Sequence, residues 1–261
     1  MTRKAAQRGG DEQQLVRSPG IDLLAAPAAA TDLVLLAHGG VVDSFDDPHA
    51  WRAPLLRMWP FAVTARAAAP TAAVGLMRYR YRGWNGPAAS PAADLRTVLG
   101  MLPARIRRVV LIGHSMGGRA VVAAGNHPLV SGVLGLAPWL PPNEPLVQLR
   151  GLVAFAHGTL DRITDPRQTA AYARRLRTGG IPVAMLTLEG EKHAMLHRAG
   201  DWNTLVGRFT RAALGDSPAC EAVSTDPNRS DPLPAWTRPT PIASGIASIA
   251  RARLGSRLTH W

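Results

Sequence analysis

The stretch GHSMGG at residues 113–118 places one serine among small residues. Ser115 follows an apolar run at 109–112 that has the length of a buried strand, and an alanine- and valine-rich stretch of helix length comes after it. We therefore predict that Ser115 lies on a tight turn from strand to helix, where glycines relieve backbone crowding. Such a turn exposes the hydroxyl of a nucleophile; a serine that only caps the helix is the alternative.

A nucleophilic serine needs a base, and two downstream histidines are candidates. His193 lies in the loop after a predicted strand at 183–188, whereas His197 lies one turn further along a predicted helix at 194–213. The position in a strand-end loop favours His193 as the base. The strand-end turns of the chain also contain three further histidines, for which we expect no catalytic role: His38, His114 and His157.

Two carboxylates follow the predicted strand at 151–156, and one of them should orient the base. Asp165 precedes Pro166 and a helical pattern, so it is predicted to be the N-cap of that helix. Asp161 has no such structural role in the loop. Asp161 is therefore the preferred partner of the histidine.

The developing oxyanion also needs hydrogen-bond donors. A predicted strand at 33–37 ends in His38-Gly39-Gly40, where glycines let backbone N–H groups turn toward a bound oxygen. We expect the N–H groups of Gly40 and Met116 to form an oxyanion hole, with Val41 as the alternative to Gly40. An ordinary tight turn is the other interpretation of this glycine pair.

The three candidate residues occur in the chain in the order Ser115, Asp161, His193, and each comes just after a predicted buried strand. The carboxyl ends of parallel strands meet at one edge of a sheet, so we expect the three side chains at that edge. Together with the His-Gly loop, these motifs resemble the α/β-hydrolase family over about residues 31–214. The resemblance implies an α/β fold, a mostly parallel sheet with helices on both faces, and a serine esterase-like hydrolase that cleaves an ester or related acyl compound through an acyl-enzyme. Only PPNEPLVQLR stands where many relatives insert a lid, so no large cap domain is expected.

Other functions compete with ester hydrolysis. An acyltransferase or another chemistry of the same fold would use the same residues, and a binding protein on this scaffold would be expected to have lost one of the three. We expect a small-molecule acyl substrate, no cofactor, no metal and no nucleic-acid partner. Val41, Trp84 and Trp139 are predicted to line the substrate site, because the two tryptophans follow strand ends on the catalytic side.

The remaining elements complete a single α/β domain at 21–214. Further strands are predicted at 72–79, 108–112 and 132–137. Helices are predicted at 50–68, 91–101, 116–126 and 166–177.

The two ends of the chain differ from this domain. Residues 1–20 are charged and expected to be disordered, and 215–261 form a proline-rich extension that ends in a short helix with Ile242 and Ile246 at helical spacing. That helix could dock on the body, on a second copy in a homo-oligomer, or on a membrane surface. Because the last motif is His193, the extension is expected to be dispensable for the chemistry.

Composition limits the setting in which the protein works. No apolar run approaches the ~20 residues that span a bilayer, and no secretion signal is recognised, so a cytoplasmic location is expected. The single Cys220 fits a reducing compartment. The net charge of +12 comes almost entirely from scattered arginines and hints at anionic partners, without any recognised nucleic-acid-binding module.

Overall fold

The structure, a computed structural model, describes residues 18–47, 52–215, 225–255 and 258–260. Its strands are β1 Gly20–Ala25, β2 Asp32–Ala37, β3 Ala73–Arg78, β4 Arg108–His114, β5 Val130–Leu136, β6 Leu152–Gly158, β7 Ala184–Leu188, β8 Asp231–Pro232 and β9 Thr259–His260. Its helices are α1 Arg52–Ala68, α2 Ser90–Gly100, α3 Met116–Ala124, α4 Pro166–Thr178, α5 Ala199–Ala213 and α6 Ile242–Leu254. The expected segment at 1–20 and Cys220 fall mostly or wholly outside the described residues.

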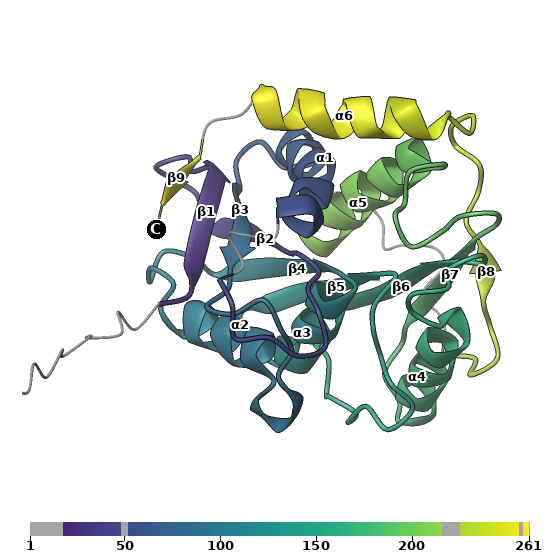
Figure 1. Cartoon of the computed structure of the whole chain (residues 1–261). Helices are drawn as coiled ribbons and strands as arrows, with labels where there is room; N and C mark the ends of the chain where they lie inside the picture. Colours follow the sequence, from purple (N-terminus) through teal and green to yellow (C-terminus); the bar gives the residue numbers. More distant parts are fainter. Residues whose placement is uncertain (1–17, 48–51, 216–224, 256–257, 261) are drawn as a thin grey trace, which may run out of the picture.

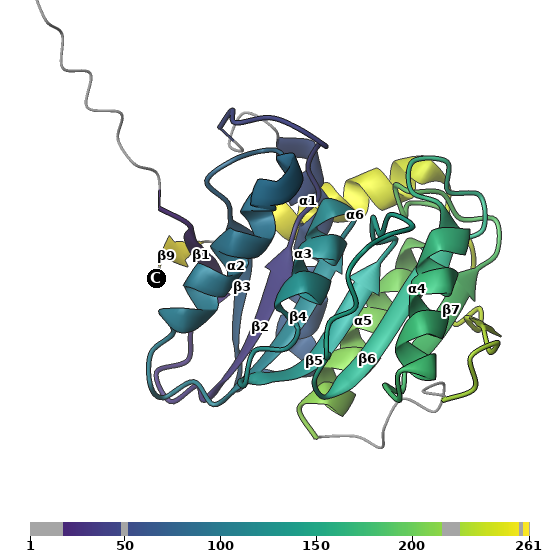
Figure 2. The same cartoon turned by 90° about the horizontal axis from the view of Figure 1, so that it is seen from below.

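One sheet, in the order β8-β7-β6-β5-β4-β2-β3-β1-β9, forms the centre of the molecule. Helices α1 and α5 cover one face, with α6 as an outer layer over them, and α2, α3 and α4 cover the other face (Figures 1 and 2). The strands from β8 to β3 in this order pair in parallel. At the other edge, β1 pairs antiparallel with β3, and β9 pairs antiparallel with β1. The predicted α/β fold with a mostly parallel sheet is therefore confirmed.

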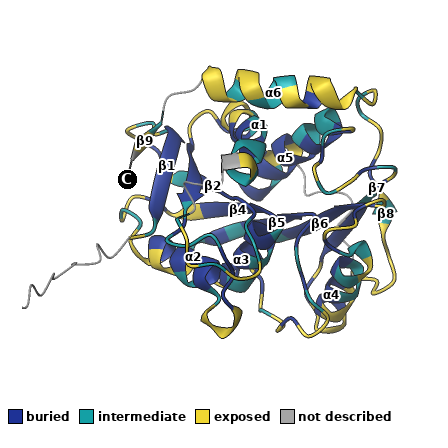
Figure 3. Cartoon of the chain, viewed as in Figure 1, coloured by how far each residue is buried: buried dark blue, intermediate teal, exposed yellow. Residues whose placement is uncertain are grey.

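The central strands are apolar along their whole length because helices bury both of their faces. Leu35 and Val110 are fully buried, and the strands appear as a continuous buried layer in Figure 3. All six predicted strands are present, with ends that differ by a few residues. The connection between β5 and β6 contains no helix, so no cap domain is inserted there.

Strand β1 was not predicted from the sequence. Its apolar run is interrupted by Asp22, which is unfavourable in a buried strand. In the folded chain Arg78 of β3 donates a hydrogen bond to the Asp22 carboxylate at 2.8 Å. Arg78, 56 positions further along the chain, thus compensates the cost of burying the Asp22 charge.

The predicted helix at 194–213 begins later than expected, at Ala199. Residues 189–198 form turns instead, so His197 is not on a helix face above His193 as predicted. Met195 has φ of +55°, a left-handed conformation that interrupts any continuing helix. The β7–α5 loop, residues 189–198, therefore carries His193 in an irregular turn.

A buried carboxylate holds this loop in shape. Glu191 is 1% exposed, and its Oε2 accepts hydrogen bonds from the Arg198 N–H at 2.6 Å and the Trp202 indole N–H at 3.2 Å. Its Oε1 accepts from the N–H groups of Lys192 and His197, at 2.9 and 3.4 Å. These N–H groups bind the side chain instead of helical carbonyls, which explains the late start of α5.

The C-terminal extension is part of the same folded body. It contributes strands β8 and β9 to opposite edges of the sheet, and α6 packs against α1 (Figure 1). Thr240 N–H donates to the His197 carbonyl at 2.9 Å, and the Arg198 guanidinium donates to the carbonyls of Leu233 and Pro234 at 3.3 and 3.2 Å. The extension thus contacts the far half of the β7–α5 loop.

Helix α6 docks on the body, one of the three possibilities that the sequence left open. Gly245 is buried against Leu196, and the Arg253 guanidinium lies 4.7 Å from the centre of the Trp59 ring. Ile242 and Ile246 are 53% and 55% exposed, so these two side chains bury little of their surface against the body. Within the described ranges, no helix has the length and apolar composition required to cross a membrane.

Glu191→Gln should destabilise the protein, because the amide group that replaces one oxygen cannot accept a hydrogen bond. We expect the free energy of unfolding to fall by about 2–3 kcal/mol, the cost of leaving buried donors unsatisfied. Urea denaturation followed by circular dichroism measures this loss. The exposed Glu189 provides the control: Glu189→Gln should change stability by less than ~0.5 kcal/mol, and an equal loss in both variants would contradict the assigned role.

Removal of residues 216–261 should also lower stability. The truncation removes both edge strands and the carbonyls that accept from Arg198, and it uncovers the apolar surface beneath α6. We expect a loss of at least about 2 kcal/mol in urea denaturation. As a control, Ile246→Ala, at an exposed site of the same segment, should change the free energy of unfolding little. A truncated chain as stable as the full chain would show that the extension does not stabilise the domain.

Candidate active site

Four loops meet at the carboxyl ends of the parallel strands, where binding sites of open α/β sheets lie. Ser115 follows β4, the His-Gly-Gly turn follows β2, Asp161 follows β6, and His193 follows β7. The order β7-β6-β5-β4-β2 places these strands close together in the middle of the sheet. The sheet therefore gathers all of the predicted catalytic positions at one edge.

Ser115 occupies the predicted turn between β4 and α3. Its backbone has φ of +57° and ψ of −120°, a strained conformation for a residue with a side chain. A Cβ added to Gly117 would clash with the carbonyl of Ala37 in β2, so glycine is needed for this close approach. The Ser115 side chain makes no capping hydrogen bond to α3, which contradicts the alternative of a serine that only caps the helix.

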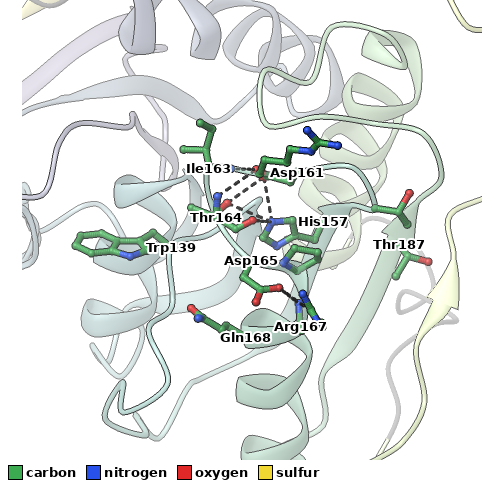
Figure 4. Close-up of a pocket in the computed structure, with 12 residues that line it drawn as sticks. Trp139, His157, Asp161, Ile163, Thr164, Asp165, Arg167, Gln168 and Thr187 are labelled. Carbon is green, nitrogen blue, oxygen red and sulfur yellow. Dashed lines mark hydrogen bonds and ion pairs between the residues drawn. The ribbon is translucent and has the colours of Figure 1, made fainter.

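Asp161 and His193 are hydrogen-bonded. His193 Nδ1 lies 2.7 Å from Asp161 Oδ2, and the Asp161 side chain is fully buried. The other carboxylate oxygen accepts from the N–H groups of Ile163 at 2.8 Å and Thr164 at 3.1 Å, as seen in Figure 4. Burial alone would raise the pKa of Asp161, but hydrogen bonds from His157 and His193, the charge of His193 and the backbone N–H of Ile163 lower it well below its usual range. The Asp161 side chain is therefore ionised.

Asp165 has the structural role that the sequence predicted. It is the N-cap of α4, where its side chain accepts a hydrogen bond from the Arg167 N–H at 2.9 Å. Pro166 occupies the first helical position, as expected. Of the two acidic residues in this loop, only Asp161 contacts His193.

His114 links the serine turn to the histidine loop. Its ring lies 4.7 Å from the ring of His193, and its Nε2 donates to the His193 carbonyl at 3.2 Å. Burial, and then the nearby charges of His193 and Arg57, hold the pKa of His114 well below its usual range. His114 therefore packs beside His193 as a neutral ring, a role that the sequence did not indicate.

The structure contains no hydrogen bond between the Ser115 hydroxyl and His193, two residues that it describes. Their neighbours, however, are in contact, since His114 directly precedes Ser115 and packs on the His193 ring. Such a bond is often absent until substrate binds.

The His-Gly-Gly turn lies against Ser115 and the residue after it. A Cβ added to Gly39 would come within 3.3 Å of Ser115 Cβ, and one added to Gly40 would overlap the Met116 side chain. The N–H of Val41 donates to the Arg82 carbonyl at 3.2 Å. The structure thus brings Gly40 and Met116 together and leaves the Val41 N–H engaged elsewhere.

Trp84 and Trp139 lie next to each other near the serine turn. Their rings are 6.2 Å apart in an edge-to-face arrangement, and the backbone N–H of Trp139 donates to the Ser115 carbonyl at 3.0 Å. The Arg119 guanidinium lies 3.9 Å from the Trp84 ring and 4.6 Å from the Trp139 ring, and it is paired with Glu144 at 2.6 Å. Arg119 therefore occupies one face of each tryptophan, which restricts the surface that a ligand could contact.

An open pocket lies beside the loop that carries Asp161 (Figure 4). Trp139 and Gln168 contribute to its wall, and Thr187 lies on the far side. Its lining does not include Ser115 or His193. Within the part of the chain that the structure describes, no three side chains of the metal-binding types cluster.

Comparisons with known proteins agree with this architecture. The sequence matches the model of the alpha/beta hydrolase family over residues 34–258, and no match was found among curated proteins. The fold is similar to those of three solved structures: an α/β serine hydrolase without lid from Xanthomonas campestris (TM-score 0.53, 16% identity, 77% of this chain and 90% of that chain), a serine hydrolase homologue from Coxiella burnetii (0.52, 17%, 70% and 86%), and esterase PE8 (0.54, 19%, 74% and 97%). At these identities the likeness shows the fold, whereas the family model covers most of the sequence. The chain belongs to the alpha/beta hydrolase family.

Proposed function

We propose that this protein is a serine hydrolase that cleaves a carboxylic ester or a related acyl compound. The observation that carries the proposal is the 2.7 Å hydrogen bond between His193 Nδ1 and the buried Asp161 carboxylate, at the same sheet edge as Ser115. A carboxylate that accepts from Nδ1 leaves Nε2 of the same ring available as a base. The strained Ser115, whose hydroxyl does not cap α3, supplies the nucleophile.

The reaction would proceed in two halves. His193 Nε2 takes the Ser115 proton as Oγ attacks the substrate carbonyl, and the imidazolium then gives that proton to the leaving alcohol as the carbon–oxygen bond breaks. Water repeats the sequence on the acyl-enzyme: His193 removes one proton, the hydroxide oxygen bonds to the acyl carbon, and the proton returns to Ser115 as the acid leaves. Asp161 stays ionised throughout and stabilises the imidazolium.

The oxyanion of each tetrahedral intermediate would bind to the N–H groups of Gly40 and Met116. Gly40 is preferred over Val41 because the Val41 N–H already donates to a carbonyl. Backbone N–H groups fixed before the reaction stabilise the developing charge without reorganisation. Trp139 would contact the acyl compound near Ser115. Trp84 is only 5% exposed, so it would pack against the Trp139 ring and not against the substrate.

Ser115→Ala should abolish turnover and leave the fold intact, because removal of the hydroxyl opens no core cavity. We expect kcat for p-nitrophenyl acetate to fall by at least about 10⁴-fold, with an unchanged circular dichroism spectrum. A fluorophosphonate probe should label the unmodified protein and fail to label this variant. Residual activity above a small fraction of wild type would remove Ser115 from the mechanism.

The two acidic residues of the β6–α4 loop, the segment between β6 and α4, provide a matched pair of variants. Asp161→Asn should lower kcat by roughly 10³- to 10⁴-fold, because an amide cannot stabilise the imidazolium. Asp165→Asn keeps a good N-cap and should change kcat and stability little. Steady-state kinetics on p-nitrophenyl esters compares them, and the opposite ranking would assign the acid role to Asp165.

A further inference from the structure

A second histidine contacts the carboxylate that holds His193. His157 is fully buried at the end of β6, and its Nε2 lies 3.1 Å from Asp161 Oδ2, the oxygen that also accepts from His193 Nδ1. The Thr164 hydroxyl lies 3.0 Å from the same oxygen. Three donors thus converge on one carboxylate oxygen, and in Figure 4 dashed lines join Asp161 to Thr164 and His157.

The surroundings of His157 fix where its proton lies. Nε2 has three neighbours: the Asp161 carboxylate at 3.1 Å and the Thr164 carbonyl at 3.2 Å, which can only accept, and the Thr164 hydroxyl at 3.2 Å, which can donate or accept. A bare Nε2 would place its lone pair against the lone pairs of the first two groups, so a proton on Nε2 is favoured. Nδ1 lies 2.9 Å from the Thr169 hydroxyl, which can donate to it or accept from it. Whether the ring is neutral or charged, the proton on Nε2 is shared between the Asp161 carboxylate and the Thr164 carbonyl, and Asp161 Oδ2 is the nearer acceptor.

We propose that His157 is a positioning residue for the acid–base pair, a proposal that rests on the function proposed above. By donating to Oδ2, His157 prevents the Asp161 carboxylate from rotating away from His193. Outer hydrogen-bond partners of this kind orient the groups that act directly in catalysis. His157 has no exposed surface, and Asp161 stands between it and His193, so it acts through Asp161 and does not touch the substrate.

The test compares two replacements of His157 in the full chain. In His157→Gln the amide nitrogen is three bonds from Cβ, as Nε2 is in histidine, so a donor still reaches Asp161. In His157→Phe the ring is kept and the donor is lost. Steady-state kinetics with p-nitrophenyl acetate, the rate of fluorophosphonate labelling and urea denaturation are measured for both.

We expect His157→Phe to lower kcat by roughly 10- to 100-fold with KM within about threefold of wild type, and His157→Gln to recover kcat to within about fivefold. A purely structural role would lower stability in both variants without this difference in kcat. His157→Phe with kcat within twofold of wild type, or His157→Gln as slow as His157→Phe, would overturn the proposal.

The outcome is separable from that of the proposed function. An unmodified protein that neither hydrolyses esters nor reacts with the probe at Ser115 would refute the hydrolase itself, whereas equal activity of the His157 variants in an active protein refutes only the positioning role. If His157→Phe does not fold, His157→Asn replaces it, because its amide is one carbon too short to reach Asp161. The same ranking, with Gln faster than Asn, is then required.

Discussion

Asp161 is an ionised carboxylate without exposed surface, and burying such a charge costs several kcal/mol unless hydrogen bonds compensate for the lost water. The donors come from three separate parts of the chain: the β6–α4 loop itself, His157 at the end of β6, and His193 in the β7–α5 loop. Satisfying this one group therefore fixes the positions of these segments relative to one another. The geometry of the proposed acid–base pair is thus a consequence of the requirement for a buried charge to be solvated by protein.

The β7–α5 loop contains a second buried carboxylate that is compensated by N–H donors. Glu191, two residues before His193, gathers the N–H groups of the loop around its own buried carboxylate, and the C-terminal extension binds the carbonyl of His197 from outside. His193 is consequently held by Asp161 on its ring, by His114 on its carbonyl, and by the turn around Glu191. A loop with this many fixed points can present a histidine without being part of a helix.

Sequence reasoning was most successful where the signal is local. The turn at Ser115 and the N-cap at Asp165 follow from glycines and a proline next to them in the chain, and the parallel strands follow from continuous apolar runs. Strand β1 and the start of α5 were missed because each depends on a distant or buried partner, Arg78 for Asp22 and the carboxylate of Glu191 for the loop. For the same reason His114 and His157 could not be assigned: nothing in the neighbouring sequence states which carboxylate or carbonyl they meet.

Ser115 contrasts with these immobilised groups. Its backbone conformation costs about 1–3 kcal/mol, and the turn is retained because its N–H donates to Leu136 and its carbonyl accepts from Trp139. The strained turn keeps the hydroxyl from binding the first N–H groups of α3, as a relaxed N-cap serine would. The fold therefore fixes the backbone of Ser115 and the ring of His193, whereas the Ser115 hydroxyl makes no capping hydrogen bond to α3. In the proposed mechanism Ser115 Oγ bonds first to His193 and then to a carbonyl carbon, so a hydroxyl that is not held by a cap is what that mechanism requires.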